Sequence, residues 1–135
     1  MSNSDMITKS TYDFSGKVIL IVEDTETSNR FYNAALSRTN ATLLWAINGD
    51  EALKKAEENP NIDAILLDLN LPGISGFEVL KVIREKNKEV SIIVQTAYVL
   101  SGEEATCFDL GASDFITKPI MLDHLLGTLN KHLTK

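Results

Sequence analysis

Short apolar runs alternate along the chain with longer stretches in which apolar and polar residues follow a helical spacing. We expect five strands at the apolar runs, which are Lys17–Val22, Thr42–Ala46, Ile62–Leu67, Val90–Val94 and Ser113–Ile116. The first, third and fourth runs are apolar at nearly every position. This pattern is typical of parallel strands that are covered by helices on both faces.

The stretches between the runs carry signals for five helices. Asn48 stands three residues before Glu51, which resembles a capping box at a helix start, and Pro60 ends that helix. Gly111 is placed to end the fourth helix. The other signals are apolar residues at helical spacing: Phe31, Ala34 and Ala35; Phe77, Leu80 and Ile83; Ala105 and Phe108; Leu122, Leu125, Leu126, Leu129 and Leu133. The alternation predicts an α/β domain with a doubly wound, five-stranded parallel sheet.

Length and composition fit one folded domain. The 135 residues, 44% apolar and 24% charged, suffice for a single core. Residues 1–16 are polar without a sustained period, so we expect a flexible tail or linker there and the domain over residues 17–135. The net charge of −6 argues against direct binding to nucleic acid or anionic membranes. The apolar runs are too short to span a bilayer and no secretion signal is visible, so the expected compartment is the cytosol.

Polar and charged residues follow the strands at the ends where doubly wound sheets bind ligands. Glu23 and Asp24 follow the first run, Asp68 the third, Thr96 the fourth and Lys118 the fifth. Each of them alone could cap a turn, end a strand or lie in solvent. Three carboxylates gathered at one edge repel one another unless a cation compensates them, and Mg²⁺ prefers such oxygen ligands. The pattern therefore predicts a Mg²⁺ site at this edge of the sheet.

The histidines and the single cysteine suggest no second site. His124 and His132 lie eight residues apart on the last predicted helix. That separation is about 12 Å along a helix axis, so we expect solvated side chains and no zinc site. Cys107 lies beside Phe108 in the fourth predicted helix, where we expect a small buried residue and not a nucleophile.

Four segments carry the motifs on which a family resemblance depends. They are VEDTETSN at residues 22–29, LLDLNLPGISG at 66–76, QTAY at 95–98 and GASDFITKPI at 111–120. In order and spacing they resemble the receiver domain of two-component response regulators, over essentially all of residues 17–135. The resemblance implies a flavodoxin-like (βα)5 fold and a phosphoacceptor function. The segment FSGKVILIVED is similar to receivers of hybrid histidine kinases. This similarity favours a fragment of such a kinase over a single-domain regulator, which stays as the alternative.

The resemblance implies a role for each acidic residue. Asp68 would accept a phosphoryl group from a phosphohistidine, and Glu23, Asp24 and Asp68 would hold Mg²⁺. The backbone carbonyl of Asn70 would be a further ligand, and its side chain would tune the lifetime of the phosphoryl group. The peptide bond before Pro119 would be cis. An ionised carboxylate suits the acceptor role, because it is a nucleophile that needs no general base.

The same resemblance implies a switch. Thr96 and Lys118 would bind oxygens of the phosphoryl group, and their movement would bias the loop of residues 96–104 and the fourth helix. Tyr98 would line the site. Phe115 stands three residues before the lysine, where the family commonly has a tyrosine. It would either couple to Thr96 by packing or serve only as a core residue.

The implied partners are a histidine kinase or histidine phosphotransfer protein as donor, and a downstream protein on the face of the fourth helix, fifth strand and fifth helix. In this interpretation the domain is not an enzyme; the catalytic domains of a hybrid kinase would lie outside these residues.

Three other functions compete with this interpretation. A Mg²⁺-dependent phosphatase or phosphotransferase similar to haloacid-dehalogenase enzymes would usually have a second aspartate where Asn70 stands. A receiver-like interaction domain that is no longer phosphorylated would usually have lost Asp24, Asp68 or Lys118. A flavin-binding domain needs a glycine-rich phosphate loop, and none follows Val22.

Overall fold

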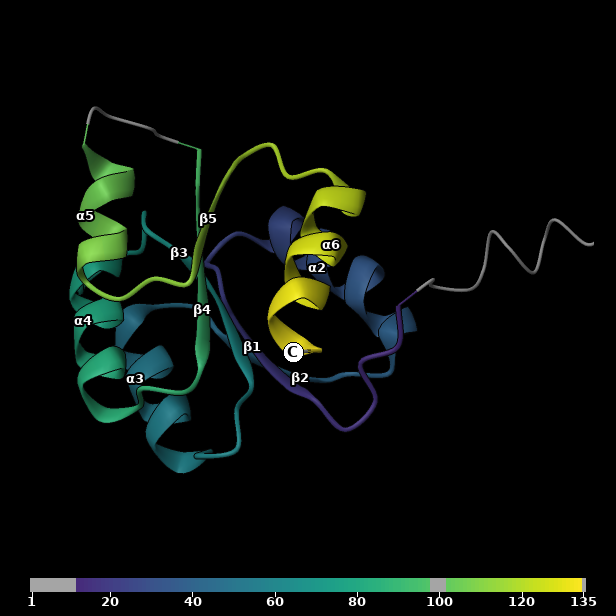
Figure 1. Ribbon diagram of the computed structural model, residues 1–135. Helices are drawn as coiled ribbons and strands as arrows, with labels where there is room; N and C mark the ends of the chain where they lie inside the picture. The colour runs from purple at the N-terminus through teal and green to yellow at the C-terminus, as the bar shows by residue number, and fades with distance from the viewer. Residues whose placement is uncertain (1–11, 98–101, 135) are drawn as a thin grey trace, which may run out of the picture.

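A parallel sheet of five strands lies between two layers of helices in this computed structural model, which describes residues 12–97 and 102–134 (Figure 1). The strands are β1 (Val18–Val22), β2 (Thr42–Ala46), β3 (Ala64–Asp68), β4 (Ser91–Thr96) and β5 (Asp114–Thr117). Their order is β2-β1-β3-β4-β5, and every neighbouring pair is parallel. The predicted doubly wound sheet is confirmed.

The helices cover both faces of the sheet. They are α2 (Glu26–Leu36), α3 (Gly49–Glu58), α4 (Gly76–Lys86), α5 (Glu103–Asp109) and α6 (Leu122–Leu133), with a short 3₁₀ turn η1 (Ser37–Thr39). Helices α3, α4 and α5 lie on one face, and α2 and α6 on the other (Figure 1). Among the helices of the described residues, none is long and apolar enough to cross a membrane.

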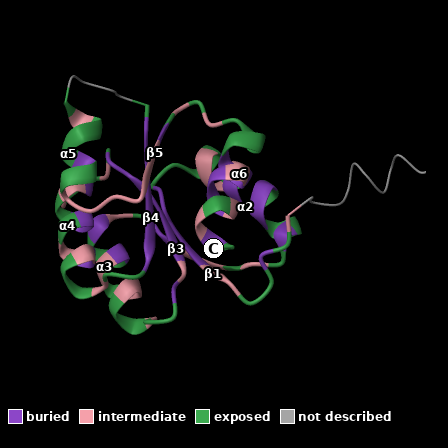
Figure 2. Ribbon diagram, viewed as in Figure 1, coloured by how far each residue is buried: buried purple, intermediate pink, exposed green. Residues whose placement is uncertain are grey.

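The sheet is buried on both faces (Figure 2), which explains its nearly continuous apolar runs. Successive side chains of a strand point to opposite faces. Leu20 and Val22 therefore join the core under α3 and α4, whereas Ile19 and Ile21 join the core under α2 and α6. Because all five strands are parallel, their carboxyl ends, with the polar residues that follow them, lie at one edge of the sheet.

The fold begins before the predicted boundary at Lys17. Phe14 is buried to 1% exposure, and its backbone N–H donates to the carbonyl of Thr39 at 2.6 Å. The ring of Tyr12 stacks on that of Phe14 with centroids 6.0 Å apart. Residues 12–16 are therefore part of the packed domain. The sequence pattern did not indicate this, because two isolated aromatic residues can fill a core without producing a periodic pattern. The remainder of the expected tail, residues 1–11, lies outside the described residues.

The signals for helix ends are confirmed. The side chain of Asn48 accepts the N–H of Glu51 at 2.8 Å, although the Glu51 carboxylate in turn accepts the N–H of Ile47. Gly111 follows α5 with φ of +110°, a conformation that glycine adopts without the steric cost of a Cβ. Cys107 is buried in α5, as expected.

The prediction of solvated histidines is wrong for His132. His124 is exposed, but the His132 side chain is 7% exposed and its Nε2 lies 3.0 Å from Oδ2 of Asp114 on β5. Lys131 also lies within 3.2 Å of that carboxylate oxygen. Together with burial, which acts in the opposite direction, these contacts leave the pKa of Asp114 below its usual value. The sequence contains no sign of this contact, since it joins two elements.

Candidate functional site

Three carboxylates meet where β1 and β3 end, as predicted. Glu23 and Asp24 follow β1, and Asp68 is the last residue of the neighbouring strand β3. One carboxylate oxygen from each residue lies within 4.8 Å of the other two. Glu23 is 1% exposed and Asp68 is 4% exposed, whereas Asp24 is open to solvent. The cluster is therefore a half-enclosed group of hard oxygen donors.

The start of α2 holds Glu23 in place. The backbone N–H and the hydroxyl of Thr25 both donate to Glu23 Oε2, at 3.2 and 3.1 Å. One turn further on, the side-chain amide of Asn29 donates to the carbonyl oxygen of Glu23 at 3.0 Å. The backbone at the end of β1 and the first turn of α2 are thus fixed to each other.

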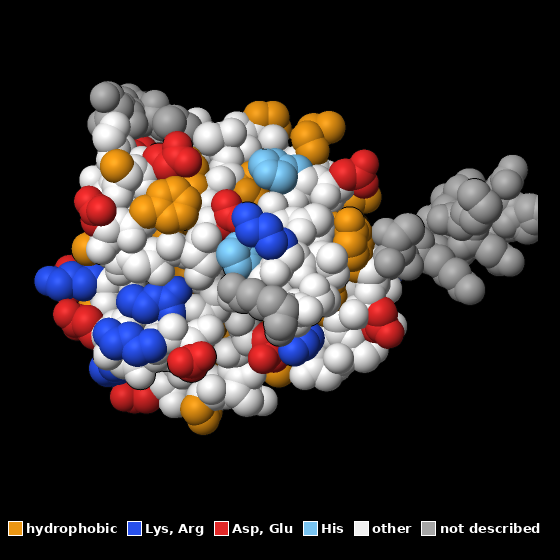
Figure 3. All heavy atoms as spheres, viewed as in Figure 1, with side chains coloured by type: hydrophobic (Ala, Val, Ile, Leu, Met, Phe, Trp, Pro, Cys, Tyr) orange, Lys and Arg blue, Asp and Glu red, His pale blue; other side chains and the backbone are white. Residues whose placement is uncertain are grey.

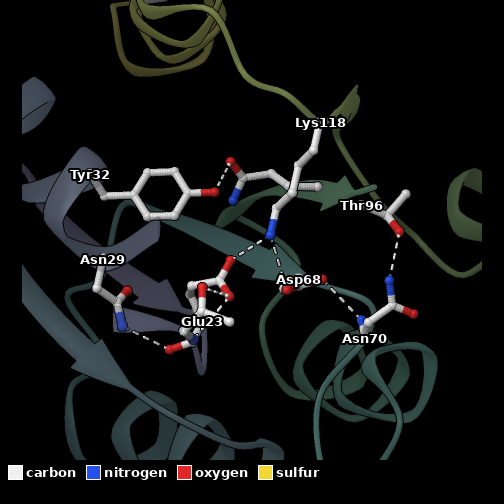
Figure 4. Close-up of polar contacts among 9 residues, drawn as sticks. Glu23, Asn29, Tyr32, Asp68, Asn70, Thr96 and Lys118 are labelled. Carbon is white, nitrogen blue, oxygen red and sulfur yellow. Dashed lines mark hydrogen bonds and ion pairs between the residues drawn. The ribbon is translucent and has the colours of Figure 1, made fainter. Parts of the chain in front are cut away.

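Lys118 brings the cation that the sequence predicted (Figure 4). Its Nζ donates to Glu23 Oε1 at 2.6 Å and to Asp68 Oδ2 at 3.2 Å. The Lys118–Pro119 peptide bond is cis, as the resemblance implied. Burial of the ammonium acts to lower the pKa of Lys118, but its contacts with the two carboxylates outweigh this effect and raise that pKa.

Asp68 is held in a position that disfavours its charge. Burial raises the pKa of its carboxyl group, and the negative charge of Glu23 adds to this effect. The N–H of Asn70, which donates to Asp68 Oδ1 at 2.9 Å, acts in the opposite direction, as does Lys118. Three carboxylates against one ammonium leave a net negative site, which a divalent cation would neutralise.

Thr96 lies at the end of β4 and is linked to Asp68 through Asn70. The Asn70 side chain donates to Thr96 Oγ1 at 3.2 Å, while the Asn70 backbone contacts Asp68. Thr96 is buried to 1% exposure.

Phe115 is partly buried and packs with the core under α3 and α4. It pairs in register with Val94, two residues before Thr96, so both Phe115 and Thr96 face the same side of the sheet. Tyr98 and the rest of 98–101 lie outside the described residues.

The first residue of α4 has to be a glycine. A Cβ on Gly76, the first residue of α4, would lie 2.5 Å from Leu69 Cα and 2.8 Å from the Asp68 carbonyl oxygen. The start of α4 therefore packs directly on the backbone that carries the acceptor candidate.

Two neighbours of the site, Tyr32 and Gln95, were not assigned a role from the sequence. The Tyr32 hydroxyl donates to Gln95 Oε1 at 2.8 Å, and both residues are 1% exposed. Burial, together with the charges of Glu23 and Asp68, raises the pKa of the Tyr32 phenol, which therefore stays protonated. The available signal was a glutamine at the end of an otherwise apolar run in β4, since a buried amide needs a partner.

The chain matches a known protein family over most of its length. The profile of the response regulator receiver domain matches residues 19–130. The chain belongs to this family. It is a receiver domain of two-component signalling, as the motifs indicated.

Individual relatives agree. The receiver domain is 30% identical over 119 residues to the polar-differentiation response regulator DivK of Brucella anthropi, covering 87% of this chain and 96% of DivK. It is 45% identical to the transcriptional regulatory protein ResD of Bacillus subtilis, over 75% of this chain and 41% of ResD. The solved CheX-CheY-BeF3-Mg²⁺ complex from Borrelia burgdorferi matches with a TM-score of 0.82 and 26% identity, over 87% of this chain and 89% of that one.

The receiver domain spans about half or less of several curated relatives, down to 7% of hybrid signal transduction histidine kinase L of Dictyostelium discoideum. Receiver domains therefore occur in this family within much longer proteins.

Proposed function

We propose that Asp68 accepts a phosphoryl group from a phosphohistidine of a histidine kinase or histidine phosphotransfer protein, in a reaction that requires Mg²⁺. The observation that carries this proposal is the convergence of the Glu23, Asp24 and Asp68 carboxylates, with the Lys118 ammonium bridging two of them. Like charges that are buried together cost free energy unless a cation or a chemical role compensates them, and one ammonium offsets only part of this charge.

The proposed reaction transfers the phosphoryl group from the donor imidazole to the Asp68 carboxylate. A carboxylate oxygen of Asp68 attacks the phosphorus, the P–N bond to the donor imidazole breaks, and its electron pair returns to the imidazole nitrogen. The ammonium of Lys118 and the hydroxyl of Thr96 then bind oxygens of the acyl phosphate. Phosphoryl transfer depends mainly on alignment and charge neutralisation, and these two side chains would contribute to both from just after β5 and from the end of β4.

The donor set suits Mg²⁺. Mg²⁺ prefers oxygen ligands and commonly takes one or two carboxylates together with waters and phosphate oxygens. Glu23, Asp24, Asp68 and the Asn70 carbonyl would supply the protein ligands, directly or through water. When bound, the ion would neutralise charge on the phosphoryl oxygens. The related CheX-CheY complex from Borrelia burgdorferi was solved with BeF3 and Mg²⁺.

The switch would run from Thr96 to Phe115. A phosphoryl group adds nearly two negative charges and draws the Thr96 hydroxyl inward. Because Thr96 and Phe115 face the same side of neighbouring strands, movement of one changes the packing of the other. The face of α5, β5 and α6 would carry the response to a downstream partner. Phe108 and Leu122 are 43% and 46% exposed there, and Figure 3 shows hydrophobic side chains over α5 and the start of α6.

The proposal is tested by intact-mass measurement after incubation with Mg²⁺ and a small phosphodonor such as acetyl phosphate. We expect one phosphate increment on the wild type and none on Asp68→Asn, with Asp63→Asn as the control aspartate away from the site. An increment that persists on Asp68→Asn contradicts the assignment.

Turnover distinguishes the phosphatase alternative. We expect a stoichiometric acceptor, so phosphate release from organic monoesters should not exceed background. The position two residues after Asp68 is Asn70, which cannot act as the general acid of such a phosphatase. Continuous release that is lost in Asp68→Asn would favour the phosphatase.

A further inference from the structure

A buried hydrogen bond between two residues that have no expected role in the site lies beside the acceptor site. The Tyr32 hydroxyl, from α2, donates to Gln95 Oε1, from β4, at 2.8 Å. The charges of Glu23 and Asp68 both act on the Tyr32 phenol, which places it in the electric field of the carboxylates. In Figure 4 the hydroxyl of Tyr32 points in the direction of the Lys118 side chain.

Gln95 lies beneath the path of Lys118. Gln95 pairs in register with Asp68 on one side and with Ile116 on the other, and register partners point to the same face of a sheet. Lys118 follows Ile116 by two residues and leaves the end of β5 on that face. To reach Asp68 on β3 and Glu23 beyond it, the Lys118 side chain must cross β4, where Gln95 is the residue on this face.

The carbonyl of Gln95 is therefore a potential competitor for the ammonium. A buried carbonyl oxygen without a donor is costly, and it recruits the nearest available N–H. Lys118 has three N–H groups. Among the described residues, Glu23 and Asp68 accept from the ammonium, which leaves a third N–H for an oxygen of the phosphoryl group. The Tyr32 hydroxyl gives the buried Gln95 carbonyl a donor, so this carbonyl gains less from taking that N–H.

We propose that Tyr32 is a positioning residue for phosphoryl transfer to Asp68, because its hydroxyl occupies Gln95 Oε1 and keeps the Lys118 ammonium directed at Asp68 and the incoming phosphoryl group. This inference rests on the proposed acceptor function of Asp68. It implies that loss of the Tyr32 hydroxyl slows phosphoryl transfer only when the Gln95 carbonyl is present.

The test is the rate of phosphorylation by acetyl phosphate at saturating Mg²⁺ in four proteins: the wild type, Tyr32→Phe, Gln95→Leu and the double variant. Loss of one neutral hydrogen bond corresponds to roughly a fivefold change, so we expect Tyr32→Phe to react about fivefold more slowly. Gln95→Leu, which has no carbonyl, should react within about twofold of the wild type. The double variant should regain the rate of Gln95→Leu, since no stray acceptor remains.

A merely structural role of Tyr32 would give a different result. Displacement of α2 would also move Glu23, through its contact with Asn29, and would change the Mg²⁺ concentration for half-maximal rate. We expect that concentration to be unchanged in Tyr32→Phe. Tyr12→Phe, at a tyrosine packed on Phe14 away from the site, is the matched control and should react as the wild type does.

Two outcomes overturn the inference. One is an unchanged rate in Tyr32→Phe, and the other is an equally slow double variant, which shows that the hydroxyl acts independently of Gln95. Failure of the wild type itself to gain phosphate refutes the acceptor function of Asp68, and this result is distinct from both.

Discussion

The ammonium of Lys118 lies closer to Glu23 than to Asp68, with Nζ distances of 2.6 and 3.2 Å to their carboxylate oxygens. Glu23 is also a candidate Mg²⁺ ligand. The lysine and the metal would therefore share one buried carboxylate, so that each influences how tightly the other is held.

Removal of the lysine tests this competition. We expect Lys118→Ala to fold and to bind Mg²⁺. Without the ion, its free energy of unfolding should be about 2 kcal/mol lower than that of the wild type, because two buried carboxylates lose their cation at a site partly open to water. Mg²⁺ should then raise its melting temperature more than it raises that of the wild type. Thermal unfolding with Mg²⁺ and with EDTA measures both effects. Lys131→Ala, which removes an exposed contact to Asp114, should show the wild-type response to Mg²⁺.

Asp24 tests the metal site with little effect on the fold. It is exposed, and it contributes an oxygen to the acidic cluster. We expect Asp24→Asn to keep the unfolding free energy in EDTA within about 0.5 kcal/mol of the wild type. Its Mg²⁺ dissociation constant should rise about tenfold, as measured by calorimetry. Glu26→Gln, an exposed carboxylate two residues further on, serves as the control, and an equal loss in both variants would show that only overall charge matters.

Because the pKa of Asp68 is raised, we expect its replacement by the neutral residue Asn to stabilise the fold by an amount that depends on pH. A carboxyl group whose pKa is higher in the folded protein stabilises the fold when it is protonated, and that stabilisation is lost as the pH rises through the folded pKa. At neutral pH and without Mg²⁺, Asp68→Asn should therefore be more stable than the wild type. The difference should shrink as the pH falls toward the ordinary carboxyl value of 3.8. Urea unfolding across this pH range measures it, and a difference that grows with acidification contradicts the prediction.

Arg84 is expected to stabilise the fold through backbone contacts. Its guanidinium donates to the carbonyls of Gly111 at 2.9 Å, Asn87 at 3.0 Å and Val90 at 2.7 Å. Arg84→Met should lose about 2–4 kcal/mol in urea unfolding, because three carbonyls lose a charged donor. Lys81→Met, an exposed position on the same helix, should change stability by less than about 0.5 kcal/mol. Equal stability of the two variants would show that water replaces the guanidinium.

The sheet and the main site residues were predictable because their signals are local. A parallel strand that is buried on both faces must be apolar along its length, so the apolar runs of β1, β3 and β4 predict these strands directly. Connectivity then places the strand ends at one edge, and it follows that Glu23, Asp68 and Lys118 meet there. Glycine at position 111 and the Asn48 cap are equally local, since each serves the backbone next to it.

Other features required the folded chain. The residue types of Phe14, Tyr32 and His132 do not indicate whether these side chains are buried, and the sequence does not show which distant element covers them. Gln95 acquires its partner only when α2 lies across β4, and Asp114 only when α6 packs on β5. The sequence by itself determined the type of each element and the chemistry at the strand ends, because both follow from neighbouring residues. Which carboxylate Lys118 approaches more closely, and which side chain supports it, was decided by tertiary packing, because those distances depend on how separate elements cross.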